Sequence, residues 1–135
     1  MRKVNLENIE LINNLPFTFE LDEYSLKGWG EVDFYGYHGE VLVLVEIEKG
    51  QKHPNTNVLK IWPYLEEHPN KSILLIQIIR SENKASKNRI NLCRFTGLRL
   101  ENLFQDRFRY IFVNLKEGDS LELDFIIDQK LNQLK

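Results

Sequence analysis

The sequence predicts a single α/β domain built around a mixed central sheet. Val41 to Val45 is apolar at every position, and Ser72 to Ile79 is apolar at nearly every position. Strands that are covered on both faces have this composition. A helical pattern lies between the two runs, and alternation of strand and helix is typical of α/β proteins. The length of 135 residues fits one domain, which we assign to residues 1–135.

Three elements are expected before the central strand. Asn5 to Asn14 has a loose helical spacing of apolar residues, which Pro16 ends. Phe17 to Leu21 alternates apolar and polar residues and predicts a short strand. Ser25 to Glu40 contains two pairs of glycines, which are typical of a twisted hairpin whose turn leads into the central strand. In that hairpin we expect Val32 and Phe34 to share one face.

A helix is expected after the central strand. The loop from Gly50 to Pro54 leads to a helix that begins near Asn57, with Asn55 or Thr56 as its cap. Pro63 should kink or divide this helix. The spacing predicts a buried stripe made of Val58, Ile61, Trp62 and Leu65. It predicts a polar stripe made of Asn57, Lys60 and Tyr64.

The C-terminal half predicts further helices and one more strand. Ser81 to Phe104 suits one or two helices, interrupted near Gly97. Arg109 to Leu115 predicts a strand, and Ser120 to Leu134 predicts a closing helix capped by Ser120.

The composition is that of an ordinary soluble globular protein, with 42% hydrophobic and 28% charged residues. No apolar run reaches the roughly 18 residues that a membrane span needs, and the first residues lack the apolar core of a signal peptide. We therefore expect a cytoplasmic protein with no membrane partner. Cys93, the one cysteine, has no disulfide partner and is expected in the core.

Charge is unevenly distributed along the chain, although the net charge is only −2. The segment from Arg80 to Lys116 holds nine basic and three acidic residues, so it carries +6 while the remainder carries −8. A basic segment beside an acidic cluster suits an enzyme that holds phosphates and a metal ion. The residues expected to bind nucleic acid are Lys84, Lys87, Arg89 and Arg94. A solvated helix face is the alternative interpretation.

An acidic cluster is predicted where the central strand ends. Glu46 and Glu48 are two residues apart and share one face of the strand, and Asp33 lies on the preceding strand. Burying neighbouring carboxylates costs several kcal/mol unless something positive meets them. A hard divalent cation, Mg²⁺ or Mn²⁺, prefers such oxygen ligands. The alternative is that these charges keep a strand end soluble and block edge pairing.

Asp33, Glu46 and Glu48 form the pattern D-x12-E-x-E, which resembles the motif of the PD-(D/E)XK nuclease superfamily. The resemblance covers Asn5 to Ile79 and implies a restriction-endonuclease-like αβββαβ core with a mixed central sheet, followed by additional C-terminal helices and a strand. Two positions depart from the family pattern. Val32 replaces the proline, and Glu48 occupies the position of the lysine.

The resemblance also implies a role for each residue. Asp33 and Glu46 would bind Mg²⁺ or Mn²⁺ with the backbone carbonyl of Ile47, and Glu48 would hold a second metal ion or orient the attacking water. Lys49 has the wrong strand parity for a catalytic lysine. Lys60 on the following helix is the better candidate, because Lys60-x-x-x-Tyr64 is similar to the Gln-x-x-x-Tyr of recombination nucleases.

Other residues that often carry chemistry are expected to be structural. His38 and His53 lie in predicted turns without metal-ligand spacing. Trp29 and Trp62 are expected in the core rather than as platforms for base stacking.

The sequence therefore predicts a metal-dependent nuclease that acts on nucleic acid, most readily DNA. We expect a homodimer, since small nucleases of this superfamily often pair so that two sites face two strands. Two alternatives remain open. One is a catalytically inactive module of the same fold that binds nucleic acid or a protein partner. The other is a stand-alone acidic metal-binding or structural protein.

Overall fold

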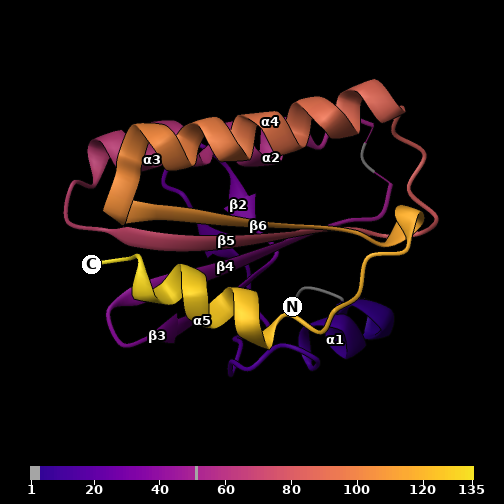
Figure 1. Cartoon of the computed structure of the whole chain (residues 1–135), viewed down its shortest axis with the longest axis horizontal. Helices are drawn as coiled ribbons and strands as arrows, with labels where there is room; N and C mark the ends of the chain where they lie inside the picture. The colour runs from indigo at the N-terminus through magenta and orange to yellow at the C-terminus, as the bar shows by residue number, and fades with distance from the viewer. Residues whose placement is uncertain (1–3, 51) are drawn as a thin grey trace.

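The fold was analysed in a computed structural model that describes residues 4–50 and 52–135. Figure 1 shows a central sheet with helices on both faces. The elements follow in the order α1 (Leu6–Ile12), β1 (Tyr24–Ser25), β2 (Glu31–Val32), β3 (Phe34–His38), β4 (Val41–Glu48), α2 (Asn55–Leu59), α3 (Ile61–Glu67), β5 (Ser72–Ile79), α4 (Lys87–Phe104), η1 (Gln105–Arg107), β6 (Phe108–Asn114), η2 (Leu115–Glu117) and α5 (Asp124–Asn132).

The main sheet has four strands in the order β3-β4-β5-β6. β3 pairs with β4 in antiparallel orientation, whereas β4, β5 and β6 run parallel. β1 and β2 form a separate two-stranded ribbon. The predicted α/β class with a mixed sheet is therefore confirmed. Because β4 and β5 are parallel neighbours, the residues at their carboxyl ends lie at the same edge of the sheet.

The central strand β4 is covered on both faces, as its composition predicts. Val43 and Val45 pack in a core with residues of α1 and α5, whereas Leu42 and Leu44 pack in a core with residues of α2, α3 and α4. Figure 1 shows these two helical layers on opposite sides of the sheet. Alternation along a strand places Glu46 with Leu42 and Leu44, under the layer of α2, α3 and α4.

A bend at Asp33 separates β2 from β3. Val32 consequently packs in the core beneath α2, α3 and α4, whereas Phe34 packs in the core beside α1 and α5. The expectation that Val32 and Phe34 share one face is wrong. A regular strand would have put them on the same side, but the bend breaks the alternation.

The helix after β4 begins at Asn55 and is divided at Lys60 into α2 and α3. A division three residues before Pro63 is expected for two reasons. Proline has no N–H to donate to the carbonyl of Leu59, and the proline ring collides with that carbonyl. The predicted cap at Asn55 or Thr56 is wrong, since Pro54 holds the cap position and no side chain among the described residues caps the helix.

The buried stripe of α2 and α3 is centred on Ile61 and includes Val58, Tyr64 and Leu65. Tyr64 was expected on the polar stripe but is 1% exposed, and its hydroxyl is hydrogen-bonded to that of Tyr24 at 2.7 Å. Trp62 was expected in the core but is 42% exposed. The Tyr64 hydroxyl has a hydrogen-bond partner and is therefore compatible with the core, so helical spacing alone placed these two aromatic residues wrongly.

Helix α4 runs without interruption through Gly97 and is capped by Ser86, whose hydroxyl accepts a hydrogen bond from the Arg89 N–H at 3.3 Å. The predicted interruption is wrong. Gly97 permits close packing instead, because a Cβ atom at this position would lie 2.3 Å from the ring of Tyr110 on β6.

Two further boundaries differ from the sequence prediction. Phe17 to Leu21 forms no strand and contributes a single bridge between Glu20 and Tyr35. The last helix begins at Asp124, and the Ser120 hydroxyl accepts a hydrogen bond from the Glu122 N–H in the preceding turn instead of capping the helix. Among the helices of residues 4–50 and 52–135, none combines the length and apolar character of a membrane span.

Candidate functional site

Asp33 and Glu46 meet where the antiparallel ladder between β3 and β4 ends. The last paired residues are Phe34 and Val45, so Asp33 and Glu46 lie just beyond them. The Asp33 N–H donates to Glu46 Oε1 at 3.0 Å, and the Ile47 N–H donates to Asp33 Oδ2 at 2.9 Å. Both carboxylates thus continue the contact between the two strands beyond the regular ladder. Glu46 is 3% exposed.

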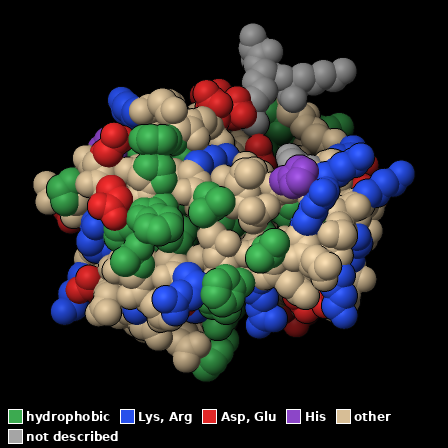
Figure 2. Space-filling view, turned by 90° about the horizontal axis from the view of Figure 1, so that it is seen from above, with side chains coloured by type: hydrophobic (Ala, Val, Ile, Leu, Met, Phe, Trp, Pro, Cys, Tyr) green, Lys and Arg blue, Asp and Glu red, His purple; other side chains and the backbone are tan. Residues whose placement is uncertain are grey.

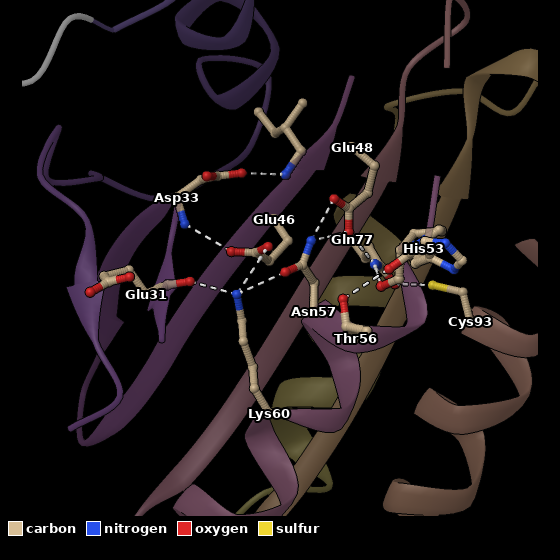
Figure 3. A network of polar contacts seen from close by, with 12 residues as sticks. Glu31, Asp33, Glu46, Glu48, His53, Thr56, Asn57, Lys60, Gln77 and Cys93 are labelled. Carbon is tan, nitrogen blue, oxygen red and sulfur yellow. Dashed lines mark hydrogen bonds and ion pairs between the residues drawn. The ribbon is translucent and has the colours of Figure 1, made fainter. Parts of the chain in front are cut away.

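Lys60 reaches this acidic pair from the junction of α2 and α3. Its Nζ lies 3.4 Å from Glu46 Oε2 and donates to the backbone carbonyl of Glu31 at 2.5 Å and to Asn57 Oδ1 at 3.0 Å. In Figure 3, Glu46 lies between Asp33 and Lys60, and the Glu31 carboxylate points away from the ammonium. The structure therefore brings Lys60 to Glu46 across the carboxyl end of the central strand.

Glu48, two residues further along β4, is fully buried. Asn57 Nδ2 donates to both carboxylate oxygens, at 2.8 and 3.0 Å, and Gln77 Nε2 donates to Oε2 at 2.5 Å. Asn57 also contacts Lys60, so its amide joins Glu48 to the Glu46–Lys60 pair (Figure 3). The four candidate catalytic residues, Asp33, Glu46, Glu48 and Lys60, belong to one connected network.

Burial dominates the electrostatics of this network. It raises the pKa of the Glu48 carboxyl to about 7, although the hydrogen bonds from Gln77 and Asn57 act in the opposite direction. Burial, reinforced by the neighbouring Asp33 charge, also raises the pKa of Glu46 well above its usual range, and the Lys60 ammonium offsets this effect only in part. The network thus contains three carboxyl groups and one ammonium, which contacts Glu46, so acidic groups outnumber the cation.

Gln77 and Asn57 are components of the site that the sequence analysis missed. Gln77 lies on β5, where its carbonyl Oε1 accepts hydrogen bonds from Tyr110 Oη at 2.6 Å and Cys93 Sγ at 2.7 Å. Its amide nitrogen donates to the Pro54 carbonyl at 3.1 Å as well as to Glu48, so both ends of the amide have hydrogen-bond partners and Gln77 is held against Glu48. A signal was present in the sequence: Gln77 is the one amide side chain in β5, where the residues from Ile73 to Ile79 are otherwise apolar. Cys93 is buried, as expected.

The donor set of the site suits a hard divalent cation. Glu46 accepts the Asp33 N–H and Asp33 accepts the Ile47 N–H, so the two carboxylates lie on adjoining strand segments, and carboxylate oxygens are ligands that Mg²⁺ and Mn²⁺ prefer. Within residues 4–50 and 52–135, no three His, Cys, Asp or Glu side chains are grouped closely enough to hold a metal ion by themselves. A cation here would therefore take waters and substrate oxygens as its remaining ligands, as Mg²⁺ usually does.

The basic segment separates into structural and solvent-facing residues. Arg80 is buried and ion-paired with Glu7 and Glu82, and Arg107 donates to the backbone carbonyls of three residues. Arg109 contacts the side chain of Gln133. The four residues expected to bind nucleic acid are exposed or half-buried on α4 and the loop before it: Lys84, Lys87, Arg89 and Arg94. Figure 2, which looks onto this helical layer, shows several Lys and Arg side chains beside a His at one end.

The remaining candidates lie away from the acidic network or at its border. Lys49 follows β4 and is exposed, and His38 ends β3 on the surface. His53 is exposed in the loop before α2, where its backbone carbonyl accepts a hydrogen bond from Thr56 Oγ1 at 2.9 Å. Trp29, which was expected in the core, is 44% exposed.

Comparison with known proteins adds no family to this description. No protein-family model, no curated protein and no solved structure matches the chain.

Proposed function

We propose that this protein is a metal-dependent nuclease of the restriction-endonuclease-like type, which hydrolyses phosphodiester bonds, with DNA as the expected substrate. The observation that carries the proposal is the placement of Lys60. Its Nζ lies 3.4 Å from Glu46 Oε2, so a cation from the following helix stands beside the acidic strand end. A nuclease site needs such a cation where Glu48 occupies the usual lysine position.

The order of the elements also supports the proposal. Helix α1, strands β3 and β4, the divided helix α2–α3 and strand β5 follow one another, and the β1–β2 ribbon precedes β3. β5 is parallel to β4, and the acidic residues lie at the carboxyl end of this pair. Ligands of open α/β sheets usually bind at this end.

Each residue has a distinct task in the proposed reaction. Asp33, Glu46 and the carbonyl of Ile47 would hold Mg²⁺ or Mn²⁺, which polarises a phosphoryl oxygen and lowers the pKa of a bound water. Lys60 would face the same phosphate and offset the negative charge that grows in the transition state. Glu48, fixed by Asn57 and Gln77, would orient the attacking water or contribute to a second metal site.

A second function is favoured by the completeness of the network. Asp33 and Glu46 each accept a backbone N–H, and Glu48 accepts hydrogen bonds from two amides. Lys60 already contacts Glu46. Such a network is satisfied without a metal ion, as it would be in a catalytically inactive module of this fold that binds nucleic acid or a protein partner.

Cleavage and binding assays separate the two functions. The purified protein is incubated with plasmid, single-stranded DNA and RNA in Mg²⁺ or Mn²⁺, with a chelator in the matched control. The nuclease proposal expects metal-dependent cleavage that the identically purified Asp33→Asn variant lacks, which also excludes a contaminating enzyme. Binding without cleavage in either metal supports the inactive module. Cleavage that Asp33→Asn retains contradicts the proposed site.

We also propose that the nuclease acts as a homodimer, so that two sites face the two strands of a duplex. Light scattering at tens of micromolar protein should give twice the mass of 16.1 kDa. A monomer mass would contradict this part of the proposal.

A further inference from the structure

Two tryptophan side chains lie on one surface of the protein. Trp29 lies in the loop between β1 and β2 and is 44% exposed, and Trp62 lies in the first turn of α3 and is 42% exposed. Together with Pro63, Glu66 and Glu67 they line an open hollow of about 400 Å³. We call this surface the tryptophan hollow. Asp33, Glu46 and Glu48 are not among its lining residues.

Both indole N–H groups are bound to carboxylates that line the hollow. Trp29 Nε1 donates to Glu67 Oε1 at 2.7 Å, and Trp62 Nε1 donates to Glu66 Oε1 at 3.1 Å. The polar end of each indole is thereby satisfied, while part of each ring stays open to solvent. A carboxylate has about four acceptor positions, so Glu66 and Glu67 can each accept further hydrogen bonds.

The loop that carries Trp29 has a defined shape. Leu26 N–H donates to the Gly30 carbonyl at 2.8 Å, and the Leu26 side chain is fully buried. Gly28 and Gly30, on either side of Trp29, have φ angles of 104° and 111°, a region that favours glycine. Backbone and indole contacts together hold Trp29 at the surface, so the hollow exists before any partner binds.

The chemistry of the lining selects a cationic ligand. Two indole faces, one proline and two carboxylates line the hollow, and no Lys or Arg is among its described lining residues. An arginine guanidinium stacks on indole faces and forms paired hydrogen bonds with a carboxylate. A phosphate backbone would instead meet two negative charges. We propose that the tryptophan hollow is a docking site for an arginine side chain in an exposed segment of a partner protein.

The two tryptophans of the hollow are the two tryptophans of the chain. Tryptophan emission, excited at a wavelength that the five tyrosines do not absorb, therefore reports on this surface. The protein is titrated with a capped five-residue peptide that contains two arginines. The matched peptide carries neutral citrulline at the same positions. The arginine peptide should cause a saturable fluorescence change and bind at least about tenfold more tightly than the citrulline peptide, because only the guanidinium adds charge-assisted hydrogen bonds.

A charge-neutralising pair of variants tests the carboxylates. Glu66→Gln combined with Glu67→Gln should weaken binding of the arginine peptide at least about tenfold. The control is Glu122→Gln combined with Asp124→Asn, which removes the same charge from exposed positions at the start of α5, on the opposite face of the sheet (Figure 1). The control should bind as tightly as the unchanged protein. Equal binding by both double variants would overturn the proposal.

Two measurements on the unchanged protein keep the test independent of variant folding. The indole N–H signals in a nitrogen-proton NMR spectrum should shift with the arginine peptide and not with the citrulline peptide. An eight-residue oligothymidine is titrated in parallel as a probe of base stacking. A saturable response to the oligonucleotide with none to the arginine peptide would overturn the proposal in favour of a nucleobase surface. The same response to both peptides would also overturn it.

Discussion

Asp33 and Glu46 each bind the backbone of the strand segment that carries the other. Glu46 accepts the Asp33 N–H at 3.0 Å, and Asp33 accepts the Ile47 N–H at 2.9 Å. The pair continues the contact between the strands after their regular ladder has ended at Phe34 and Val45. The two acids proposed to hold a metal ion therefore also hold the chain, and substitutions must separate these roles.

Asp33→Asn should separate metal binding from stability. The asparagine carbonyl can still accept the Ile47 N–H, whereas the lost charge should abolish Mn²⁺ binding measured by calorimetry. Asp33→Ala removes the acceptor as well, and an unpaired N–H in this location should lower the free energy of unfolding by about 1 to 3 kcal/mol. Urea denaturation measures this difference. Equal Mn²⁺ affinity in Asp33→Asn and the unchanged protein would reject the proposed metal site.

Lys60→Ala should reduce single-turnover cleavage by a factor of about 10² to 10³, the usual effect of removing one electrostatic donor from an active site. Mn²⁺ binding should persist, because Lys60 is not a ligand. The matched control is Lys49→Ala, an exposed lysine one residue beyond β4, which should leave the rate nearly unchanged.

A metal titration identifies the rival source of positive charge. If Lys60→Ala cleaves normally and the rate is second order in Mg²⁺ at low concentration, a second metal ion at Glu48 supplies the charge in place of Lys60.

The metal-free protein should become less stable as the pH rises from about 4.5 to 7. The pKa of Glu48 is about 7 in the folded protein against an ordinary value of 4.5, so the folded state binds this proton more tightly. The stabilisation is complete below pH 4.5 and is lost as the pH rises through 7, by about 1.4 kcal/mol for each unit of difference in pKa. Urea denaturation in chelator should show a shallower pH dependence for Glu48→Gln. Parallel pH profiles for the two proteins would contradict the raised pKa.

Nucleic-acid affinity should depend strongly on salt, because each phosphate contact releases counterions. Reversing the charge of Lys84, Lys87 and Arg94 together should weaken binding to all sequences and lower the slope of log affinity against log salt by roughly 0.9 per lost contact with duplex DNA. Lys27→Glu, on the exposed loop beside Trp29, is the control. Affinity that barely changes between two salt concentrations would show that these residues are only solvated surface.

Gly97→Ala should destabilise the protein by about 1 to 3 kcal/mol, as overpacking of a core usually does. The new Cβ would lie 2.3 Å from the Tyr110 ring, and Tyr110 cannot shift freely because its hydroxyl binds Gln77. The neighbouring substitution Thr96→Ala is the control, since the Thr96 hydroxyl donates to the Leu92 carbonyl of its own helix. Equal unfolding midpoints in urea would mean that the Gly97 contact is not tight.

The sequence predicted the parts of the fold that depend on local pattern. The run Ser72–Ile79 matched β5 residue for residue, because a strand covered on both faces is apolar at both parities. The approach of Lys60 to Glu46 was also predictable, since it follows from the helical position of Lys60 after the strand. These features need no knowledge of distant contacts.

Features set by tertiary contacts were not predictable in this way. In the sequence, a glycine at position 97 indicates an interruption of the helix. The structure shows that it instead makes room for the ring of Tyr110. Trp62 and Tyr64 are both large aromatic residues, and only the hydroxyl of Tyr24, far away in sequence, shows which of them is buried. The bend at Asp33 could not be predicted in this way, because neither glycine nor proline occupies that position.

The proposed catalytic residues are close together in the sequence, whereas the residues that hold Glu48 in place include some that are far from it in the sequence. Asp33 and Glu46 are joined by a contact that spans 13 residues, and Asn57 and Glu48 by one that spans 9. The contacts of Gln77 with Glu48 and Tyr110 span 29 and 33 residues. A single contiguous exchange of residues 31–60 could therefore transfer or alter the acidic site as a cassette. The rigidity of Glu48 within any such chimera would still depend on β5, α4 and β6 of the host.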